Sequence, residues 1–536
     1  MKFRSSLLLA IVLGAAMLSC SSKKTYKSTM HNLIPKPVSA NETNEVFTLS
    51  DSTAIYVQSD SPADLQVAQW FADKIKPATG FALKVSASKE APKAGGIYLI
   101  YGTDSTLGDE GYELNISKDM VRITANTPAG WFYALQTIRQ LLPPDAELGT
   151  TQKGPWQIAA GTIRDYPEYT YRGSMLDVAR HFFSVEDVKR YIDLIAAYKM
   201  NILHLHLSDD QGWRIEIKSW PNLTSIGGST EVGGGKGGFY TQEQYKDIVK
   251  YAQDRFVTII PEIDMPGHTN AALASYPELH SIDSSVANLQ KNMEQHKETD
   301  TAINLYTGTE VGFSTLRTHK EITYKFIDDV IRELAAITPG PWIHIGGDES
   351  HVTSKEDYIP FVTKVQQMVV AHGKKVIGWD EIALSTTMQP NSAVQFWADA
   401  DNSKLAVSKG AKVIMSPAKK AYLDMQYDST TRLGLHWAAY IEVDSAYMWD
   451  PANYADSIRR ENILGVEGAL WSETITKMDD IEYMVFPRLP GLAELAWSPA
   501  AGRSWDEYKV RLGNQAPRFK AMGIDYYPSK LVPWKE

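Results

Sequence analysis

Eight short apolar segments recur in the later part of this chain, and most of them are separated by stretches with a helical pattern. Apolar strands that alternate with helices are typical of βα units, and eight such units close into a TIM barrel. We therefore predict an α/β fold in which residues 166–536 form a (β/α)8 barrel. The candidate strands lie near residues 171–176, 201–207, 257–263, 342–345, 375–379, 393–397, 412–415 and 463–470.

Two connections between these strands stand out. Too little chain lies between Glu381 and Ser392 for a full crossover helix, so we expect a degenerate fifth helix. The glycine-rich run at 227–238 fits no nucleotide-binding motif, and we interpret it as a loop. We accordingly expect no cofactor.

Residues 33–165 precede the barrel and show a different pattern of predicted strands and helices. Short strands are predicted at 54–57, 96–101 and 120–124, with helices at 63–76 and 127–142. A chain of 536 residues with 43% hydrophobic content is long enough for two domains. We predict a smaller α+β domain here, in which the aromatic residues that follow Gly130 serve core or interdomain packing.

The N-terminus follows a secretory pattern. Lys2 and Arg4 precede an apolar stretch at 7–18, and Ser19-Cys20 follows. This stretch is too short to span a bilayer as a stable helix. A lone cysteine at this point resembles a bacterial lipoprotein processing site, although Met17 stands where such sites usually have leucine. We predict a signal peptide at 1–19, a lipid anchor on Cys20 and a tether at 20–32; the alternative is a secreted protein with an incidental cysteine.

This N-terminal pattern predicts an exported, outer-membrane lipoprotein. No acidic residue follows Cys20 closely, which favours the periplasmic face. Because Cys20 is the only cysteine, an intramolecular disulfide and a zinc site built on several thiolates are excluded. The formal net charge of -10 is spread along the chain without a basic patch, which argues against nucleic-acid binding. Oligomeric state leaves no readable trace.

Polar or aromatic side chains follow nearly every candidate strand, where a barrel gathers its active site. Several tryptophans and carboxylates at one mouth suit a sugar, because indoles stack on pyranose rings and carboxylates bind hydroxyls. The residues concerned are Asp177, Arg180, Ser208, Asp209, Asp210, Asp264, His268, Asp348, Glu349, Trp379, Asp380, Glu381, Trp397, Tyr422, Asp424, Trp471 and Glu473.

The pair Asp348-Glu349 closes the apolar run 342–345 through Gly346-Gly347. Neighbouring residues of an extended chain point to opposite sides, so the two carboxylates cannot face one substrate group in the same way. The spacing therefore predicts different roles for them.

Four ordered motifs resemble the family 20 glycoside hydrolases, the β-N-acetylhexosaminidases. They are Arg172-Gly173-Ser174-Met175-Leu176-Asp177, the run 204–214 from His204 to Arg214, Pro261-Glu262-Ile263-Asp264-Met265-Pro266-Gly267-His268, and His344-Ile345-Gly346-Gly347-Asp348-Glu349. The resemblance covers the barrel and implies that residues 33–165 form the non-catalytic domain that precedes it in this family. It also implies retaining, exo-acting removal of terminal β-linked N-acetylhexosamine from a glycan, through an oxazolinium formed by the substrate's own acetamido group.

The resemblance implies a role for each matching residue. Glu349 is the expected general acid, Asp348 holds the acetamido N–H, and Tyr422 donates to the acetamido oxygen. The walls of the acetamido pocket are expected to be Trp379, Trp397 and Trp471. The ring hydroxyls are expected to bind Arg172, Asp424 and Glu473, and the residues expected behind the acid are Asp209 and His268. Trp437 is expected beside the leaving sugar.

Three alternatives stay open from the sequence. His204 and His206 face the same side of one strand and could bind a metal, but the other strand ends carry tryptophans, so we expect no metal. A non-catalytic glycan-binding lipoprotein is a second reading. A family member that releases a disaccharide or prefers a sulfated sugar is the third. The choice between N-acetylglucosamine and N-acetylgalactosamine, and the natural glycan, stay open.

Overall fold

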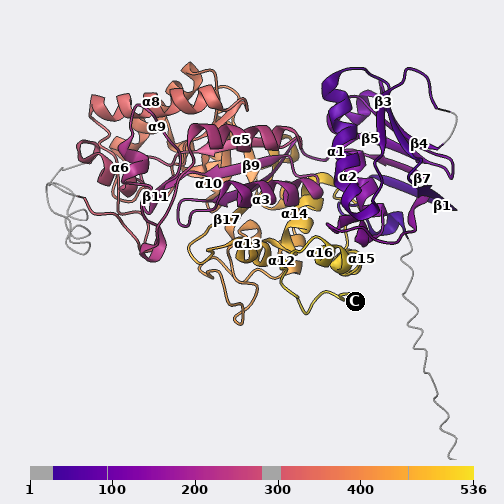
Figure 1. Cartoon of the computed structure of the whole chain (residues 1–536). Coiled ribbons are helices and arrows are strands. Elements are labelled where there is room, and N and C mark those ends of the chain that lie inside the picture. Colours follow the sequence, from indigo (N-terminus) through magenta and orange to yellow (C-terminus); the bar gives the residue numbers. More distant parts are fainter. Residues whose placement is uncertain (1–27, 93–94, 281–302, 457, 536) are drawn as a thin grey trace, which may run out of the picture.

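A computed structural model of the chain describes residues 28–92, 95–280, 303–456 and 458–535. It has two domains, which lie side by side in Figure 1: a small one at the N-terminal end of the described chain and a large barrel. The predicted signal peptide and Cys20 lie outside the described residues.

The small domain is a seven-stranded sheet with the order β1-β7-β5-β6-β4-β2-β3. Helices α1 (Pro62–Thr79) and α2 (Pro128–Leu141) pack on it. The predicted strands and helices are confirmed within a few residues, whereas β1, β3, β5 and β7 were not anticipated. The strands are Ser39–Leu49, Ala54–Val57, Lys84–Ala87, Gly96–Tyr101, Tyr112–Ile116, Met120–Ala125 and Trp156–Asp165.

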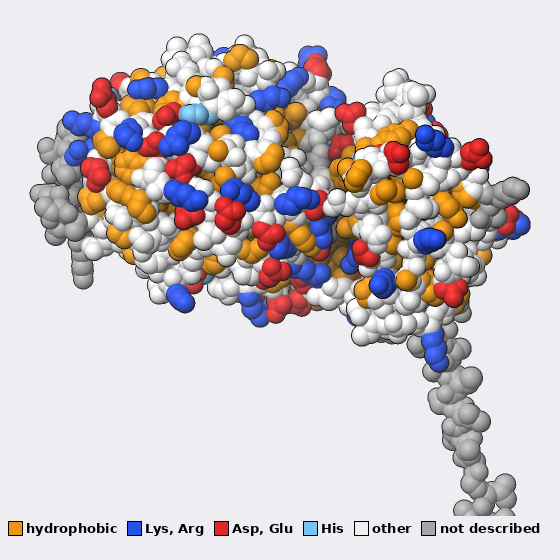
Figure 2. All heavy atoms as spheres, turned by 45° about the horizontal axis from the view of Figure 1, so that its top comes forward, with side chains coloured by type: hydrophobic (Ala, Val, Ile, Leu, Met, Phe, Trp, Pro, Cys, Tyr) orange, Lys and Arg blue, Asp and Glu red, His pale blue; other side chains and the backbone are white. Residues whose placement is uncertain are grey.

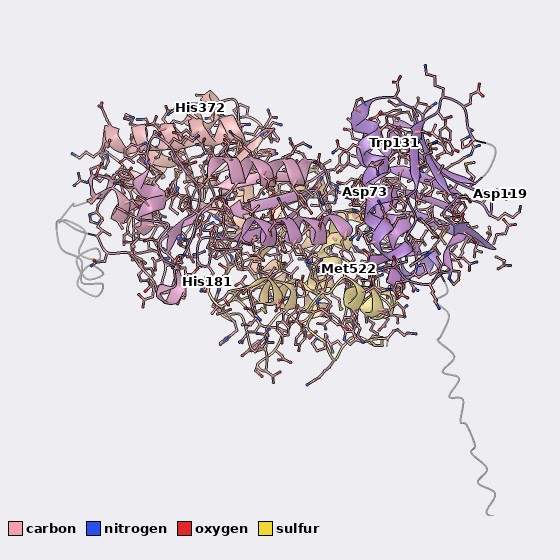
Figure 3. The ribbon with its side chains drawn as sticks, in the orientation of Figure 1. Asp73, Asp119, Trp131, His181, His372 and Met522 are labelled. Atoms are coloured by element: carbon pink, nitrogen blue, oxygen red, sulfur yellow. The ribbon has the colours of Figure 1, made fainter. Side chains whose placement is uncertain are left out.

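Helix α2 shows why the core of this domain sits between helix and sheet. Thr127 caps the helix by accepting the N–H of Ala129, and Pro128 occupies the first turn, where its missing N–H costs nothing. Trp131, labelled in Figure 3, is fully buried and donates from Nε1 to the Ile100 carbonyl. Phe132 reaches Phe256 of the barrel, with ring centroids 5.3 Å apart. The predicted core and interdomain packing of these aromatics is confirmed.

The last residues of the predicted tether are packed rather than free. Ser28 is buried and donates to the Leu141 carbonyl, and Met30 is only 2% exposed. A short 3-10 helix, Met30–Asn32, follows. The folded domain therefore includes Ser28, five residues before the predicted boundary, because an apolar side chain at position 30 finds a place in the core.

The large domain is a closed eight-stranded parallel barrel with the order β12-β13-β14-β15-β16-β17-β8-β9. Every predicted barrel strand is present. In chain order the strands are β8 (Tyr171–Asp177), β9 (Ile202–His206), β12 (Thr258–Glu262), β13 (Trp342–His344), β14 (Lys375–Trp379), β15 (Ala393–Phe396), β16 (Lys412–Met415) and β17 (Ile463–Leu470).

Helices surround the barrel, and their starts are set by ordinary caps. Capping boxes open α3 (Val185–Ala197) and α5 (Gln242–Gln253). The fifth connection contains only a 3-10 turn, η6 (Asp380–Leu384), as predicted. The other helices are α4 (Asn222–Ser225), α6 (Asn270–Ser275), α8 (Glu321–Ile337), α9 (Lys355–Ala371), α10 (Ala400–Ser408), α11 (Ala418–Ala421), α12 (Val443–Tyr447), α13 (Met478–Val485), α14 (Arg488–Trp497), α15 (Trp505–Gly513) and α16 (Ala516–Ala521); two short strands, β10 (Ser208–Asp209) and β11 (Gly212–Trp213), form a hairpin after β9.

The surface carries charges of both signs. On the face shown in Figure 2, Lys and Arg side chains are interspersed with Asp and Glu over both domains. Within the described ranges, no helix combines the length and the apolar character that crossing a membrane requires.

Candidate active site

A cavity of about 260 Å³ opens at the carboxyl ends of the barrel strands. Most of its wall consists of side chains that the sequence analysis placed after strand ends, so the predicted convergence at one mouth is observed. The lining residues are Arg180, His268, Thr309, Val311, Asp348, Glu349, Trp397, Tyr422, Leu435, Trp437, Trp471 and Glu473.

The loop after β13 places the two adjacent carboxylates differently. Gly346 and Gly347 have φ values of 64° and 105°, and a Cβ at Gly346 would lie 1.8 Å from Asp264 Oδ1. Only glycine allows that approach. Glu349 itself has φ 44°, a strained value for a non-glycine residue. The side chain of Asp348 is 10% exposed and that of Glu349 27%, so one carboxylate is buried and the other faces the cavity.

Asp348 lies in a crowded acidic environment. Burial, and then the neighbouring charge of Asp264, raise the pKa of Asp348 well above its usual range. Burial also raises the pKa of Asp264 to about 7. His268 Nε2 lies 3.7 Å from Asp348 Oδ2 and 3.7 Å from Glu349 Oε2. A ligand that donates an N–H to a carboxylate in this position would stabilise its ionised form.

Behind the acid, Asp209 binds four donors. Its Oδ2 accepts from His206 Nε2 at 2.8 Å and pairs with Arg180 Nη2 at 2.9 Å. Its Oδ1 accepts from His268 Nδ1 at 3.2 Å and from the Asp210 N–H at 2.6 Å. Burial opposes the charge, but Arg180 and His268 hold the pKa of Asp209 well below its usual range. Asp209 is therefore a fixed anion that connects the arginine with the histidine beside the acid.

Aromatic side chains form one side of the cavity. Trp397 and Tyr422 stack at an interplanar angle of 13°, and Trp437 meets Tyr422 edge-on with centroids 6.0 Å apart. Trp437 is 57% exposed at the entrance. Trp379 does not line the cavity directly; it lies behind Trp471, 5.6 Å away between ring centroids. Four of the five predicted aromatic residues thus line the cavity, and Trp379 supports one of them.

A second polar group lies at the other end of the site. Arg180 stacks over Trp471, with Cζ 4.8 Å from the ring centroid, and its charge lowers the pKa of Glu473, although burial dominates and the net shift is upward. Asp424 is 2% exposed, and neither carboxylate oxygen has a hydrogen-bond partner among the described residues. Burial and the charge of Glu473 raise the pKa of Asp424 well above normal. Buried acceptors without hydrogen-bond partners are suited to ligand hydroxyls.

The structure corrects the assignment of Arg172. This residue lies near the amino end of β8, at the opposite end of the barrel from the cavity. Its guanidinium makes two hydrogen bonds to Glu110 of the small domain, at 2.7 and 2.8 Å, and stacks over Trp497. The side chain is completely buried. Arg172 therefore joins the two domains and cannot reach a ligand in the cavity.

Three residues at the site were placed after strand ends by the sequence analysis but were given no individual role there. Arg180 fills the place expected for Arg172, and its position just after β8 was a usable signal. Asp264 follows β12 and accepts the Gly347 N–H at 3.0 Å. Glu381 follows β14 and accepts from Trp397 Nε1 at 3.1 Å. All three are polar residues directly after a strand.

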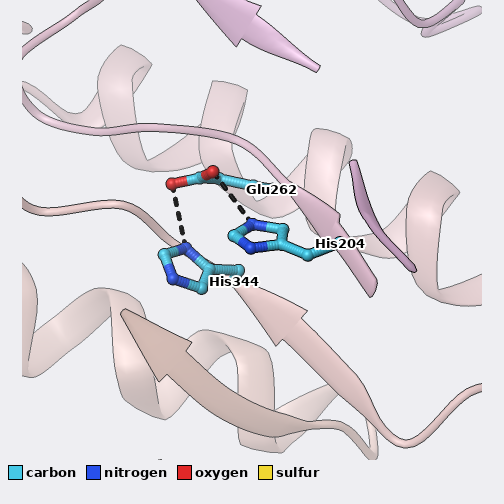
Figure 4. Close-up of side chains that lie close together, drawn as sticks. All are labelled: His204, Glu262 and His344. Carbon is cyan, nitrogen blue, oxygen red and sulfur yellow. Dashed lines mark ion pairs between the residues drawn. The ribbon is translucent and has the colours of Figure 1, made fainter. Parts of the chain in front are cut away.

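The barrel interior holds side chains of metal-ligating type. His204, Glu262 and His344 form one such buried group, shown in Figure 4. His204 Nε2 lies 2.9 Å from Glu262 Oε2, and His344 Nδ1 lies 3.0 Å from Glu262 Oε1. His206, which the sequence analysis considered with His204 as a possible ligand, contacts the same Glu262 through Nδ1 and Asp209 through Nε2. Glu262 is thus paired with all three imidazoles, whereas His344 Nε2 has no hydrogen-bond partner among the described residues.

The fold and site define a glycoside hydrolase of family 20, and the chain belongs to that family. The profile of the "Glycosyl hydrolase family 20, catalytic domain" matches residues 169–358 and 351–500, and "Glycosyl hydrolase family 20, domain 2" matches residues 30–166.

Named relatives support the same placement. A β-N-acetylhexosaminidase of Cellulomonas fimi is 39% identical over 94% of this chain and 97% of its own length. The structure of the family 20 β-N-acetylhexosaminidase from Streptomyces coelicolor A3(2) has a TM-score of 0.88 and 47% identity, covering 95% of this chain and all of that one. A mutant Streptomyces plicatus β-hexosaminidase, solved with its product GlcNAc, has a TM-score of 0.88 and 48% identity over 95% of this chain and 98% of its own.

Proposed function

We propose that this family 20 enzyme removes terminal β-linked N-acetylhexosamine from the non-reducing ends of glycans by substrate-assisted catalysis. The observation that carries this proposal is the pair after β13: a buried Asp348 beside aromatic walls, followed by Glu349 facing the cavity. A buried carboxylate with a raised pKa suits an N–H donor, and the neighbouring carboxyl is free to exchange a proton with a leaving group.

In the first step, the acetamido oxygen of the substrate attacks the anomeric carbon while Glu349 gives its proton to the departing glycosidic oxygen. The product of this step is an oxazolinium, whose positive charge Asp348 stabilises through the amide N–H. The Tyr422 hydroxyl donates to the acetamido oxygen and aligns it. Water then attacks the anomeric carbon, Glu349 takes the water proton, and two inversions leave the β configuration unchanged.

The size of the cavity supports release of single sugars. About 260 Å³ is small for a ligand pocket, which favours one sugar ring over a disaccharide. Arg180 and Glu473 line the cavity and, together with Asp424, which is buried near Glu473, they would bind the hydroxyls of the terminal ring. His268 and Asp209 would support the acid, and Trp437 would contact the leaving sugar at the entrance.

The test compares aryl β-glycosides that differ only at carbon 2, one with an acetamido group and one with a hydroxyl. The wild-type enzyme should cleave only the acetamido substrate, with or without EDTA, and Asp348→Ala should reduce that activity by about 100-fold or more. Comparable cleavage of both sugars would indicate a protein nucleophile and refute the mechanism. Loss of activity in EDTA would point to a metal.

We also propose a lipid anchor on Cys20 and residence on the periplasmic face of the outer membrane. Lys2, Arg4, the apolar stretch at 7–18 and the position of the lone cysteine support this. Labelling with a radioactive fatty acid should mark the full chain and not Cys20→Ser. Equal labelling of both, or of neither, would contradict the anchor.

A further inference from the structure

Glu262 lies in the barrel core, just beneath the active site, and is completely buried. It belongs to β12, and its two carboxylate oxygens bind side chains that lead to different parts of the site. Oε1 accepts from Trp379 Nε1 at 2.9 Å. Oε2 accepts from His206 Nδ1 at 2.6 Å. Neither the cavity lining nor any proposed contact with substrate includes Glu262.

The first branch leads to the aromatic wall. Trp379 packs against Trp471, which lines the cavity. The indole N–H is the only donor of the Trp379 side chain, so the hydrogen bond to Glu262 fixes the orientation of the ring. The plane of this ring therefore depends on one buried carboxylate oxygen.

The second branch leads to the acid. His206 has a carboxylate at each ring nitrogen, Glu262 at Nδ1 and Asp209 at Nε2, so it can satisfy both only by donating twice, as an imidazolium. Burial opposes that charge, but Glu262 and Asp209 raise the pKa of His206 well above its usual range. Asp209 then reaches His268, whose Nε2 lies 3.7 Å from Glu349 Oε2.

We propose that Glu262 is a positioning residue that aligns the acetamido wall and the general acid with each other, because one carboxylate holds both Trp379 and the His206-Asp209-His268 series. This inference rests on the proposed function. It predicts that loss of the Glu262 carboxylate weakens acetamido binding by the aromatic wall and acid catalysis by Glu349 at the same time.

The core offers a matched control for this idea. Glu467, on β17, is equally buried and pairs with His204 Nδ1 at 2.9 Å, as Glu262 pairs with His204 Nε2 at 2.9 Å. Glu467 otherwise accepts hydrogen bonds from Gln395 and Tyr171, and neither of these residues lines the cavity. Glu467→Gln thus removes a buried carboxylate charge from the same cluster without touching either branch.

The experiment uses Glu262→Gln, Glu467→Gln and Trp379→Phe. Glutamine presents one acceptor and one NH2, so it cannot accept from both Trp379 and His206, and it no longer holds a second proton on His206. Two quantities are measured on β-N-acetylglucosaminides: the inhibition constant of a stable thiazoline analogue of the oxazolinium, and the ratio of kcat/KM for a dinitrophenyl over a phenyl leaving group. The first reports on the acetamido wall. The second rises when acid catalysis weakens, because dinitrophenolate departs without a proton.

We expect Glu262→Gln to raise both quantities about tenfold, Trp379→Phe to raise only the inhibition constant, and Glu467→Gln to change neither. A change in only one quantity for Glu262→Gln, or equal changes in Glu467→Gln, would overturn the proposal. If Glu262→Gln does not fold, histidine ¹⁵N NMR of the wild type decides: His206 must keep protons on both ring nitrogens from pH 5 to 9. A wild type that cleaves 2-hydroxyl glycosides equally would instead refute the proposed function itself.

Discussion

Replacing Asp264 by asparagine should stabilise the protein at high pH and leave its stability at low pH almost unchanged. Asp264 is 1% exposed, burial raises its pKa to about 7, and its Oδ2 has no hydrogen-bond partner among the described residues. Because the folded-state pKa is raised above the unfolded value of about 3.9, the contribution of this carboxyl to stability is fully present below that value and is lost as pH rises through 7.

The magnitude follows from the two pKa values. Ionising Asp264 in the folded state costs about 0.5 kcal/mol at pH 4 and about 4 kcal/mol at pH 8 relative to the unfolded chain. Asparagine removes this cost, and its oxygen can still accept the Gly347 N–H. The two domains together have roughly 510 residues and an unfolding entropy of about 1.1 kcal/mol/K. The variant should therefore melt about 4 °C higher at pH 8 and less than about 1 °C higher at pH 4.

Calorimetry at the two pH values gives the stability difference, and a pH profile of kcat/KM gives a second readout. The charge of Asp264 is the largest cause, after burial, that raises the pKa of Asp348. Without it Asp348 ionises at lower pH, so the acidic limb of the profile should move to lower pH. An equal increase in Tm at both pH values, or an acidic limb that moves upward, would refute the reasoning.

Three further predictions concern single side chains of the site. Glu349→Gln should reduce kcat for a phenyl leaving group by about 100-fold or more while calorimetry still detects binding of N-acetylglucosamine; equal loss of binding would contradict its role as acid. Arg180→Met should raise KM by about tenfold or more, whereas Arg172→Met should lower Tm with KM unchanged; the reverse pattern would restore the original assignment of Arg172. Trp437→Ala should reduce kcat/KM several-fold for chito-oligosaccharides and less for small aryl glycosides; equal effects on both substrates would exclude contact with the leaving sugar.

The barrel was predictable because its strands are buried on both faces and therefore form continuous apolar runs. The edge strand β1 of the small domain could not be predicted in the same way. β1 has only two buried residues among eleven, and its polar sequence gives no period-2 signal. Its place is set by pairing with β7, a contact between residues more than a hundred positions apart. Long-range pairing of this kind cannot be read from one sequence.

The same distinction applies to the site. Residues directly after strand ends were found, because parallel strands in a barrel bring those ends together. Arg172 was misplaced because a motif identifies a strand without showing which of its residues lies at which end. Position in β8 separates it from Arg180: Arg172 is the second residue of the strand, and Arg180 comes three residues after its last. The φ of 44° at Glu349 and the approach of Asp264 to Gly346 depend on tertiary contacts that no local pattern encodes.

The contact between Arg172 and Glu110 has a consequence for how the protein can be divided. Arg172, Lys199 and Asn201 of the barrel all bind residues of the small domain, and the Lys199–Asp165 pair, at 2.8 Å, is also buried. Cutting the chain between the domains would leave an arginine and a lysine in an apolar environment without their counterions, at a cost of several kcal/mol. The barrel should therefore not fold stably without the small domain, and the two domains should melt in a single calorimetric transition.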